Sequence, residues 1–448
     1  MTFCDEEIKF FMKESTFIYC ITSFTFLVVG FFILVQRAFS FFEKKGIPRG
    51  GVPRVPFGNV KDVIYQECNF NIHLWKYYNR FKRKKFHFAG LYILFKPFVM
   101  MMDPFLIYTV LTDKKHFQSQ KDISKLFKDE IQDQLLEKYD TLEEIIYKSL
   151  VEKSYNLDYE SLDAFFVETS SAILGLPITQ NKKYSSNLLH YFSLCHESVW
   201  KIFTPNSSYN KNLKSQIANE ILRRKKNDLR KFDLINSLSE NNTSDFEEIL
   251  DFCFDSMEYS KSITQFCLYE LCQNSDIQQE IIGEVRRFRK DERKITRKNL
   301  NQLAILDATI KECLRKYPPR ATIMKKCCED FKNEKYKLNI PRHCMTVISV
   351  YGVHHDPMNF PNPEEFDPDR FYEENDKYLK SYSFVPFGDD ENTEIYTKYI
   401  VLQVKLCLLT ILSRYKVYLK NSCKLEFDCR KTTLSPKEPF VFNLEVLK

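Results

Sequence analysis

The chain has 448 residues, of which 44% are hydrophobic and 15% aromatic, and it carries a formal net charge of +6 at pH 7. This length suits one large fold or two to four domains, and the apolar content is ample for a large core. The basic runs are interleaved with acidic residues or lie in helix-like segments. Without zinc-finger spacing or another recognised signature beside them, they predict no nucleic-acid partner.

An uncharged stretch of 22 residues lies near the N-terminus, at Ser15 to Gln36 (STFIYCITSFTFLVVGFFILVQ). As a helix it would be about 33 Å long, enough to cross the roughly 30 Å hydrocarbon core of a bilayer. The alternative is a cleavable signal peptide, but no small-x-small cleavage site follows the stretch. The sequence therefore predicts a single transmembrane anchor at residues 15–36, preceded by a tail at residues 1–14.

The charges on the two sides of this stretch differ. The tail is net acidic, whereas the residues after the anchor are mostly basic: Arg37, Lys44, Lys45, Arg49, Arg54 and Lys61 against Glu43 alone. Because positive charge stays on the cytoplasmic side of a membrane, we expect the tail to be lumenal and the rest of the chain to be cytosolic.

Residues 37–59 are predicted to form a hinge. Three prolines and four glycines occur between Gly46 and Gly58, a density that interrupts any helix. Such a linker is stiff and irregular, and it would lay the following domain, residues 60–448, against the membrane surface.

Most of residues 60–448 has helical periodicity. Apolar residues recur at intervals of three and four in ELCQNSDIQQEIIGEVRRF and NLNQLAILDATIKECLRKY, with Asn274-Ser275 and Asn299 as candidate caps. Strands are expected in three stretches: FAGLYILFKPFVMMM, TVISVYGV and KEPFVFNLEVL. We therefore predict one α+β fold, mostly α with a small β region.

Three local patterns point to a particular family. Glu312 and Arg315 stand three apart on one helical face, which by itself would also fit an ordinary surface ion pair. Arg370 follows in FDPDRF, inside a proline-rich meander where it could complete a buried Glu-Arg-Arg cluster. The loop SFVPFG, beginning at Ser383, comes next and leads into an apolar helix.

In this order and spacing, the patterns resemble the cytochrome P-450 family of heme-thiolate monooxygenases, most of all its membrane-anchored microsomal branch in insects. The resemblance covers most of the chain, including the proline hinge, the first sheet and the second half of the long central helix. It implies a cytochrome P-450-like fold, heme iron as cofactor and a structural triad of Glu312, Arg315 and Arg370. It also implies lipophilic substrates, electrons from an NADPH–cytochrome reductase, and an endoplasmic reticulum membrane location with the domain facing the cytosol.

The heme loop departs from the family pattern Phe-x-x-Gly-x-Arg-x-Cys-x-Gly. Phe387 fits the first place and Gly388 follows it in the bend, but the four later places hold Asp390, Asn392, Glu394 and Tyr396. Glu394 thus stands at the position of the heme-ligand cysteine. Two interpretations remain open: Glu394 binds ferric iron, or it is an acid near the positive N-terminus of the next helix. Cys407 lies 13 residues on, roughly 20 Å along a continuous helix.

Further departures affect the oxygen-activation groove and the substrate pocket. Glu258 keeps the acid of the groove, whereas Tyr259 replaces the threonine that the family uses to deliver protons. The segment after HFQSQ lacks a Trp-x-x-x-Arg helix, and the stretch from Trp200 to Phe232 is too short for two roof helices. We therefore expect truncated B–C and F–G regions.

These departures together predict a pseudoenzyme, a monooxygenase-derived protein with absent or greatly reduced activity. One alternative is a working monooxygenase or other oxidoreductase with non-thiolate heme ligation. Another is a non-catalytic partner of reductases or of intact family members. A third is a decayed gene product that barely folds.

Overall fold

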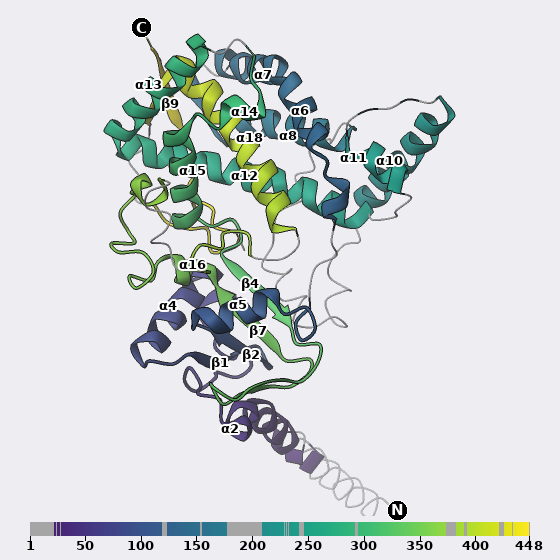
Figure 1. Ribbon diagram of the computed structural model, residues 1–448. Coiled ribbons are helices and arrows are strands. Elements are labelled where there is room, and N and C mark those ends of the chain that lie inside the picture. Colours follow the sequence, from purple (N-terminus) through teal and green to yellow (C-terminus); the bar gives the residue numbers. More distant parts are fainter. Residues whose placement is uncertain are drawn as a thin grey trace, which may run out of the picture.

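The computed structural model describes residues 22–23, 25–26, 28–118, 123–152, 155–176, 208–227, 229, 231, 233–241, 246–291, 294–372, 382–388, 392–420, 425–431 and 433–447. It has a sheet-bearing half next to the N-terminal helix and a larger helical half that ends at the C-terminus (Figure 1). Each half has its own hydrophobic cluster. The predicted α+β fold, mostly helical with a small β region, is confirmed.

The sheet-bearing half is built from segments far apart in the sequence. Its main sheet has four strands in the order β1-β2-β7-β4, with β2 and β7 parallel and the other pairs antiparallel. Its elements are α2 (Phe41–Lys45), α3 (Lys61–Ile64), α4 (Phe70–Arg83), β1 (Phe88–Ile93), β2 (Lys96–Met101), α5 (Pro104–Thr112), β4 (Thr322–Lys326), β5 (Phe331–Asn333), β6 (Leu338–Ile340), β7 (Met345–Ser349) and α16 (Val350–His354).

The helical half packs around two long helices that contact each other, α12 and α18. Its elements are η1 (Ser124–Leu126), α6 (Asp129–Glu137), α7 (Tyr139–Glu152), β3 (Asn156–Leu157), α8 (Tyr159–Leu174), α10 (Ser208–Lys226), α11 (Leu234–Asn241), α12 (Phe246–Gln273), α13 (Ser275–Asp291), α14 (Arg297–Leu300), α15 (Ala304–Lys316), η3 (Pro368–Phe371), α18 (Thr393–Arg414), β8 (Tyr415–Leu419) and β9 (Phe442–Val446). The strands β3, β9 and β8 form a small separate sheet.

Helix α18 is the one helix of the described residues that is long and apolar enough to cross a membrane, yet 83% of that apolar window is buried inside the domain. It packs against α8, α12, α13 and α15. Because its apolar side chains already contact protein, α18 is the core helix of the fold. The predicted anchor at 15–36 is only partly described, since residues 1–21, 24 and 27 lie outside the described residues.

The described part of the N-terminal helix leads into α2, which docks on the main sheet. The Phe42 side chain is fully buried, with its ring centroid 4.7 Å from that of Tyr92. α2 ends at Gly46, whose φ of 65° is left-handed and therefore suits glycine. A short helix thus occupies part of the predicted hinge, and the Pro/Gly-rich stretch after Gly46 contains no helix before α3.

Two predictions were wrong in detail, one about the end of a strand and one about a helix cap. The strand expected in TVISVYGV ends at Ser349, where the chain turns into α16 because Ser349 caps that helix and accepts a hydrogen bond from Gly352 N. Asn299 was expected to cap a helix, but Thr296 is the N-cap of α14. Asn299 is instead the third helical residue, and its side chain accepts from Thr296 N at 2.7 Å, which completes a capping box.

Candidate functional site

The first part of the site is a buried cluster of charges between α15 and the meander after α16. Arg315 donates from Nε and Nη2 to the two carboxylate oxygens of Glu312 at 2.7 and 2.8 Å, and neither side chain is exposed. Burial raises the pKa of Glu312, while Arg315 opposes that shift. Arg370 Nε lies 3.6 Å from Glu312 Oε1, too far for a hydrogen bond. The structure therefore brings the three predicted residues together, with Arg370 the looser member.

His354 connects this cluster to the loop that precedes α18. Its Nδ1 lies 2.9 Å from Arg315 O, and its Nε2 accepts from Val385 N at 3.0 Å. Since a carbonyl only accepts and a backbone N–H only donates, the proton of the neutral ring is on Nδ1. Burial, reinforced by Arg315, lowers the pKa of His354 to about 3, so the ring stays neutral and keeps both contacts.

The loop before α18 makes a tight turn at the predicted bend. Gly388 has a φ of 96° and donates its N–H to Val385 O at 3.1 Å; this left-handed conformation favours glycine. Arg320 stabilises the turn, because its Nη1 donates a hydrogen bond to Phe387 O at 3.0 Å. Asp390 and its neighbours 389 and 391 lie outside the described residues.

Glu394 and Asn392 point in different directions at the start of α18. The Glu394 side chain is 75% exposed, and its carboxylate pairs with Lys398 Nζ one turn later at 2.6 Å. Asn392 is buried, and its Oδ1 accepts from Ile123 N at 3.1 Å. Thus Glu394 is a surface acid in the first turn of a helix, and Asn392 ties that turn to the segment before α6.

Tyr396 occupies the space between the start of α18 and α12. Only 5% exposed, its ring lies 5.0 Å from that of Phe252 and 6.4 Å from that of Tyr259, both on α12. The ring of Phe387 is nearly parallel to that of Tyr396, at an angle of 17° and a centroid distance of 6.3 Å. We call Phe252, Tyr259, Phe387 and Tyr396 the aromatic cluster.

The two predicted residues of the oxygen-activation groove separate in the structure. Glu258 is paired with Lys261, one turn later on α12, at 2.9 Å between Oε1 and Nζ. The same Nζ lies 2.7 Å from Oδ1 of Asp163 on α8, so Lys261 links the Glu258 carboxylate to α8. Tyr259 instead contributes to the aromatic cluster. Ser256, also in the groove, accepts from Gln403 Nε2 of α18 at 2.5 Å. The side chains of Ser256, Glu258 and Tyr259 therefore all contact other side chains of the protein.

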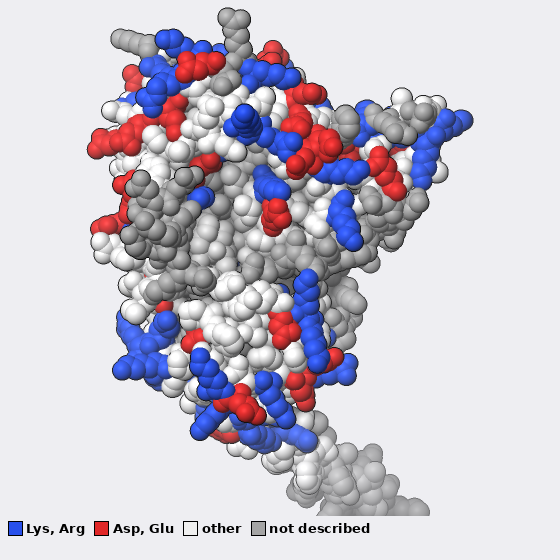
Figure 2. Space-filling model, viewed as in Figure 1, with Lys and Arg blue, Asp and Glu red and all other residues white. Residues whose placement is uncertain are grey.

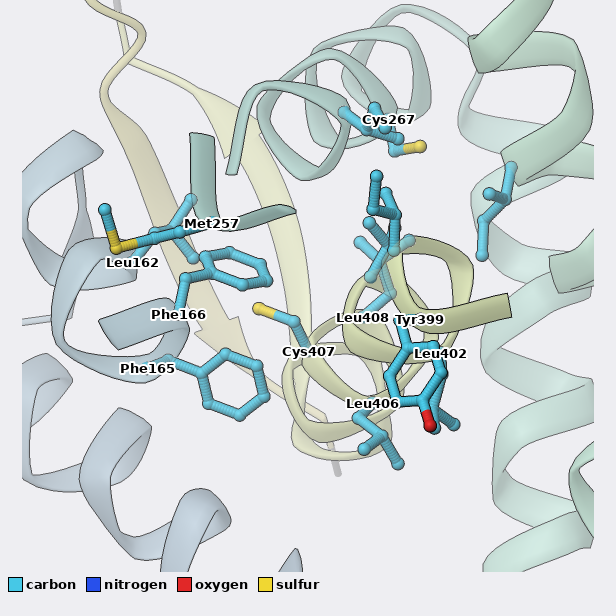
Figure 3. Close-up of a cluster of buried hydrophobic side chains, with 14 of the residues drawn as sticks. Leu162, Phe165, Phe166, Met257, Cys267, Tyr399, Leu402, Leu406, Cys407 and Leu408 are labelled. Atoms are coloured by element: carbon cyan, nitrogen blue, oxygen red, sulfur yellow. The ribbon is translucent and has the colours of Figure 1, made fainter. Parts of the chain in front are cut away.

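Cys407 lies in the core and away from the loop. Its side chain is fully buried on α18, beside Phe165 and Phe166 of α8 (Figure 3). Burial raises the pKa of its thiol, which disfavours the thiolate that binds metal. The sequence has no cysteine between Cys344 and Cys407, so the loop and the first three turns of α18 contain no thiol.

Comparison with known proteins identifies the fold family. The profile of the cytochrome P450 family matches residues 135–444, which is more than half of the chain. The chain belongs to the cytochrome P450 family. Cytochrome P450 6j1 of Blattella germanica is 24% identical over 475 positions, covering 90% of this chain and 92% of that protein.

Two fly relatives align over shorter regions. Probable cytochrome P450 6d4 of Drosophila melanogaster is 33% identical over 187 residues, 42% of this P450 chain and 36% of that protein. Probable cytochrome P450 6a13 of the same species is 30% identical over 233 residues, 50% of this chain and 47% of that protein. The chain thus aligns with less than half the length of these two relatives, and it is a P450 of the insect type.

Heme is the cofactor of the P450 family, but the described residues of this P450 chain do not fit a thiolate-ligated heme. The residue at the cysteine position, Glu394, is directed to solvent. The ring of Tyr396 is packed against Phe252 of α12. Position 392, where the family pattern has arginine, is an asparagine whose side-chain oxygen accepts a hydrogen bond from Ile123 N.

Sequence reasoning missed two residues of this site. Arg320 follows the two prolines after α15, and that PPR run was the available signal. The role of His354 as a link between Arg315 and Val385 had no local signal, because its partners are 39 and 31 residues away. In the stretch from Trp200 to Phe232, where the sequence leaves too little length for two roof helices, the described residues form one helix, α10 (Ser208–Lys226). Residues 200–207 lie outside the described residues.

Proposed function

We propose that this chain is a membrane-anchored P450-family protein that keeps the family's scaffold and has absent or greatly reduced monooxygenase activity. The observation that carries the proposal is the placement of Glu394, exposed and paired with Lys398 where the family has its cysteine. A cysteine thiolate pushes electron density onto heme iron and favours O–O cleavage. A carboxylate is a harder donor and does not replace that push.

The groove on α12 supports the same proposal. The family delivers protons to oxygen through a threonine hydroxyl, and Tyr259 stands at that position. Its bulky ring packs toward Tyr396, and Ser256 is bonded to Gln403. The side chains that would face the reacting oxygen are thus committed to helix packing.

A membrane anchor is supported by the exposed apolar side chains of the N-terminal helix. Phe26, Phe32 and Leu34 are 79%, 66% and 67% exposed, an arrangement that is costly in water and favourable in lipid. Basic side chains gather at the end of the sheet-bearing half from which this helix leaves (Figure 2). Positive charge beside an apolar helix is typical of the cytoplasmic side of a membrane, and we propose the endoplasmic reticulum as that membrane.

The test is an absorption spectrum of the full chain, purified from cells supplied with heme, then reduced and exposed to carbon monoxide. NADPH-dependent oxidation of lipophilic test substrates is measured in parallel with a reductase. Cytochrome P450 6j1, prepared in the same way, is the positive control. We expect no thiolate-type carbon monoxide shift and no turnover above the reductase alone; reductase-dependent oxidation by this chain would refute the proposal.

A non-catalytic role beside reductases or intact family members is favoured by the preserved scaffold. The buried Glu312–Arg315 pair and the core around α18 are intact, which argues against a decayed product that barely folds.

An open polar cleft of about 640 Å³ lies beside the Glu394–Lys398 pair, lined by residues of α6, by residues in and next to α14, and by Lys398. If a partner docks there, adding this chain to membranes with reductase and cytochrome P450 6j1 will lower the turnover of 6j1, and a Lys398→Glu variant will lower it less. Unchanged turnover with the wild-type chain would argue against this role.

A further inference from the structure

We propose that Tyr396 closes the space between α12 and α18, so that this P450 chain completes its core without a tetrapyrrole. The inference rests on the proposed function and deepens it: the site is packed shut by protein as well as being inactive. In the family motif a glycine stands at this place, two residues after the cysteine. Here the largest change in side-chain volume in the loop falls on the residue that faces α12.

The ring distances leave no room for a planar macrocycle between the helices at this point. The centroids of Tyr396 and Phe252 are 5.0 Å apart. A flat ring inserted between two side chains needs about 3.5 Å on each face, roughly 7 Å in all. The ring of Phe387 also lies near that of Tyr396, nearly parallel to it and with centroids 6.3 Å apart, so the tyrosine ring is packed among side chains of the protein.

Hydrogen bonds hold the same two helices together one to two turns further along α18. Gln403 donates from Nε2 to Ser256 Oγ of α12 at 2.5 Å and accepts from Thr169 Oγ1 of α8 at 2.7 Å. All three side chains are buried. These bonds join α18 directly to α12 and α8, with no other group between the helices. The aromatic cluster therefore lies next to a part of the core where the helices already contact one another.

Two polar side chains beside the aromatic cluster form hydrogen bonds within the described part of the chain. Arg320 lies with its guanidinium carbon 5.7 Å from the Tyr396 ring centroid while it donates to Phe387 O. Asn392 accepts from Ile123 N. An anionic cofactor that used these two side chains would have to displace the contacts that they make here.

The experiment measures thermal unfolding of the full chain in detergent, prepared from heme-depleted cells, with and without added hemin. Three variants accompany the wild type. Tyr396→Gly removes the ring, Tyr396→Phe keeps the ring without its hydroxyl, and Thr397→Gly is the matched control for a glycine in the same turn. Thr397 is exposed and its hydroxyl donates a hydrogen bond within α18, to Thr393 O at 2.8 Å, so its substitution reports mainly the cost of glycine in that turn.

We expect the heme-free wild type to unfold cooperatively and hemin to shift its midpoint by less than about 1 °C, because a ligand that does not bind the folded state does not stabilise it. Tyr396→Gly should lower the midpoint by roughly 5 °C more than Thr397→Gly. Tyr396→Phe keeps the ring and loses the 3.5 Å contact of the hydroxyl with Asp255 Oδ2, so it should lower the midpoint far less than Tyr396→Gly. If Tyr396→Gly does not fold while Thr397→Gly does, the inference is also supported.

Two results would overturn the inference. The first is a one-to-one Soret band with a midpoint raised several degrees by hemin in the wild type. The second is a Tyr396→Gly variant that is as stable as Thr397→Gly. Hemin binding without a thiolate shift or turnover would refute the packed site and leave the proposed loss of activity in place, so the two proposals fail separately.

Discussion

Arg315 and Glu312 form a two-pronged ion pair that is fully buried, at 2.7 and 2.8 Å. Arg315 also donates from Nη1 to His354 O at 3.0 Å. The pair therefore joins α15 to α16, and through the His354 ring it reaches the loop before α18. This fixed geometry persists although the loop has no thiol.

Replacing Arg315 with leucine should destabilise the protein by about 3–5 kcal/mol, because Glu312 would be left as a buried, uncompensated charge. The free energy of unfolding is measured by chemical denaturation of the full chain. Arg370→Leu should cost clearly less, since its Nε is 3.6 Å from Glu312 and its side chain is 11% exposed. Equal losses for the two variants would contradict the ranking.

Replacing Glu394 with alanine should change stability by no more than about 1 kcal/mol, because an exposed ion pair on a helix contributes little. If hemin is added, the absorption spectra of Glu394→Ala and wild type should coincide. A band that moves on substitution would mean that the carboxylate reaches iron, contrary to its pairing with Lys398.

Acidification should destabilise the protein already below pH 6.5 through His354. Its folded-state pKa, about 3, is below the unfolded value of 6.5, so the unfolded chain binds the proton first. The contribution of neutral His354 to the free energy of unfolding is fully present above pH 6.5. It is lost as the pH falls toward 3, by about 1.4 kcal/mol per pH unit. Buried His355, whose pKa is also lowered by burial, acts in the same direction.

The check is the slope of unfolding free energy against pH between 6.5 and 5, where most carboxylates are still ionised. His354→Gln should have a shallower slope than the wild type, whatever its stability at pH 7. An identical slope would show that His354 takes up no extra proton on unfolding.

Two glycine-to-alanine substitutions should change the free energy of unfolding in opposite directions. A Cβ at Gly90 would lie 2.5 Å from Phe42 Cδ1, so Gly90→Ala should cost about 1–3 kcal/mol by displacing α2 from the sheet. A Cβ at Gly283 would meet only Arg287 Nη1 at 3.7 Å, and Gly283→Ala in α13 should add roughly 0.4–1 kcal/mol. Thermal unfolding of both variants measures the difference; a destabilised Gly283→Ala would contradict the free space beside Gly283.

Much of the fold was readable from local patterns. The hairpin of β1 and β2, the helix pair α13 and α15, and β9 all coincide with predicted stretches, because periodicity and residue type are local properties. The end of β7 was missed because the capping hydroxyl of Ser349 determines where the strand stops. For Asn299, the sequence indicated a capping residue but left its position in the box undecided.

The sequence by itself determined the family motifs, the absence of cysteine from the loop and the pairing of Glu312 with Arg315, since these depend on residue identity and short spacing. Only the tertiary structure decided that Glu394 faces solvent while Tyr396 faces α12. Both residues lie in the first turn of one helix, and the rotation of that helix against its neighbours is fixed by long-range packing. The same packing made α18, apolar enough for a membrane, the centre of the core.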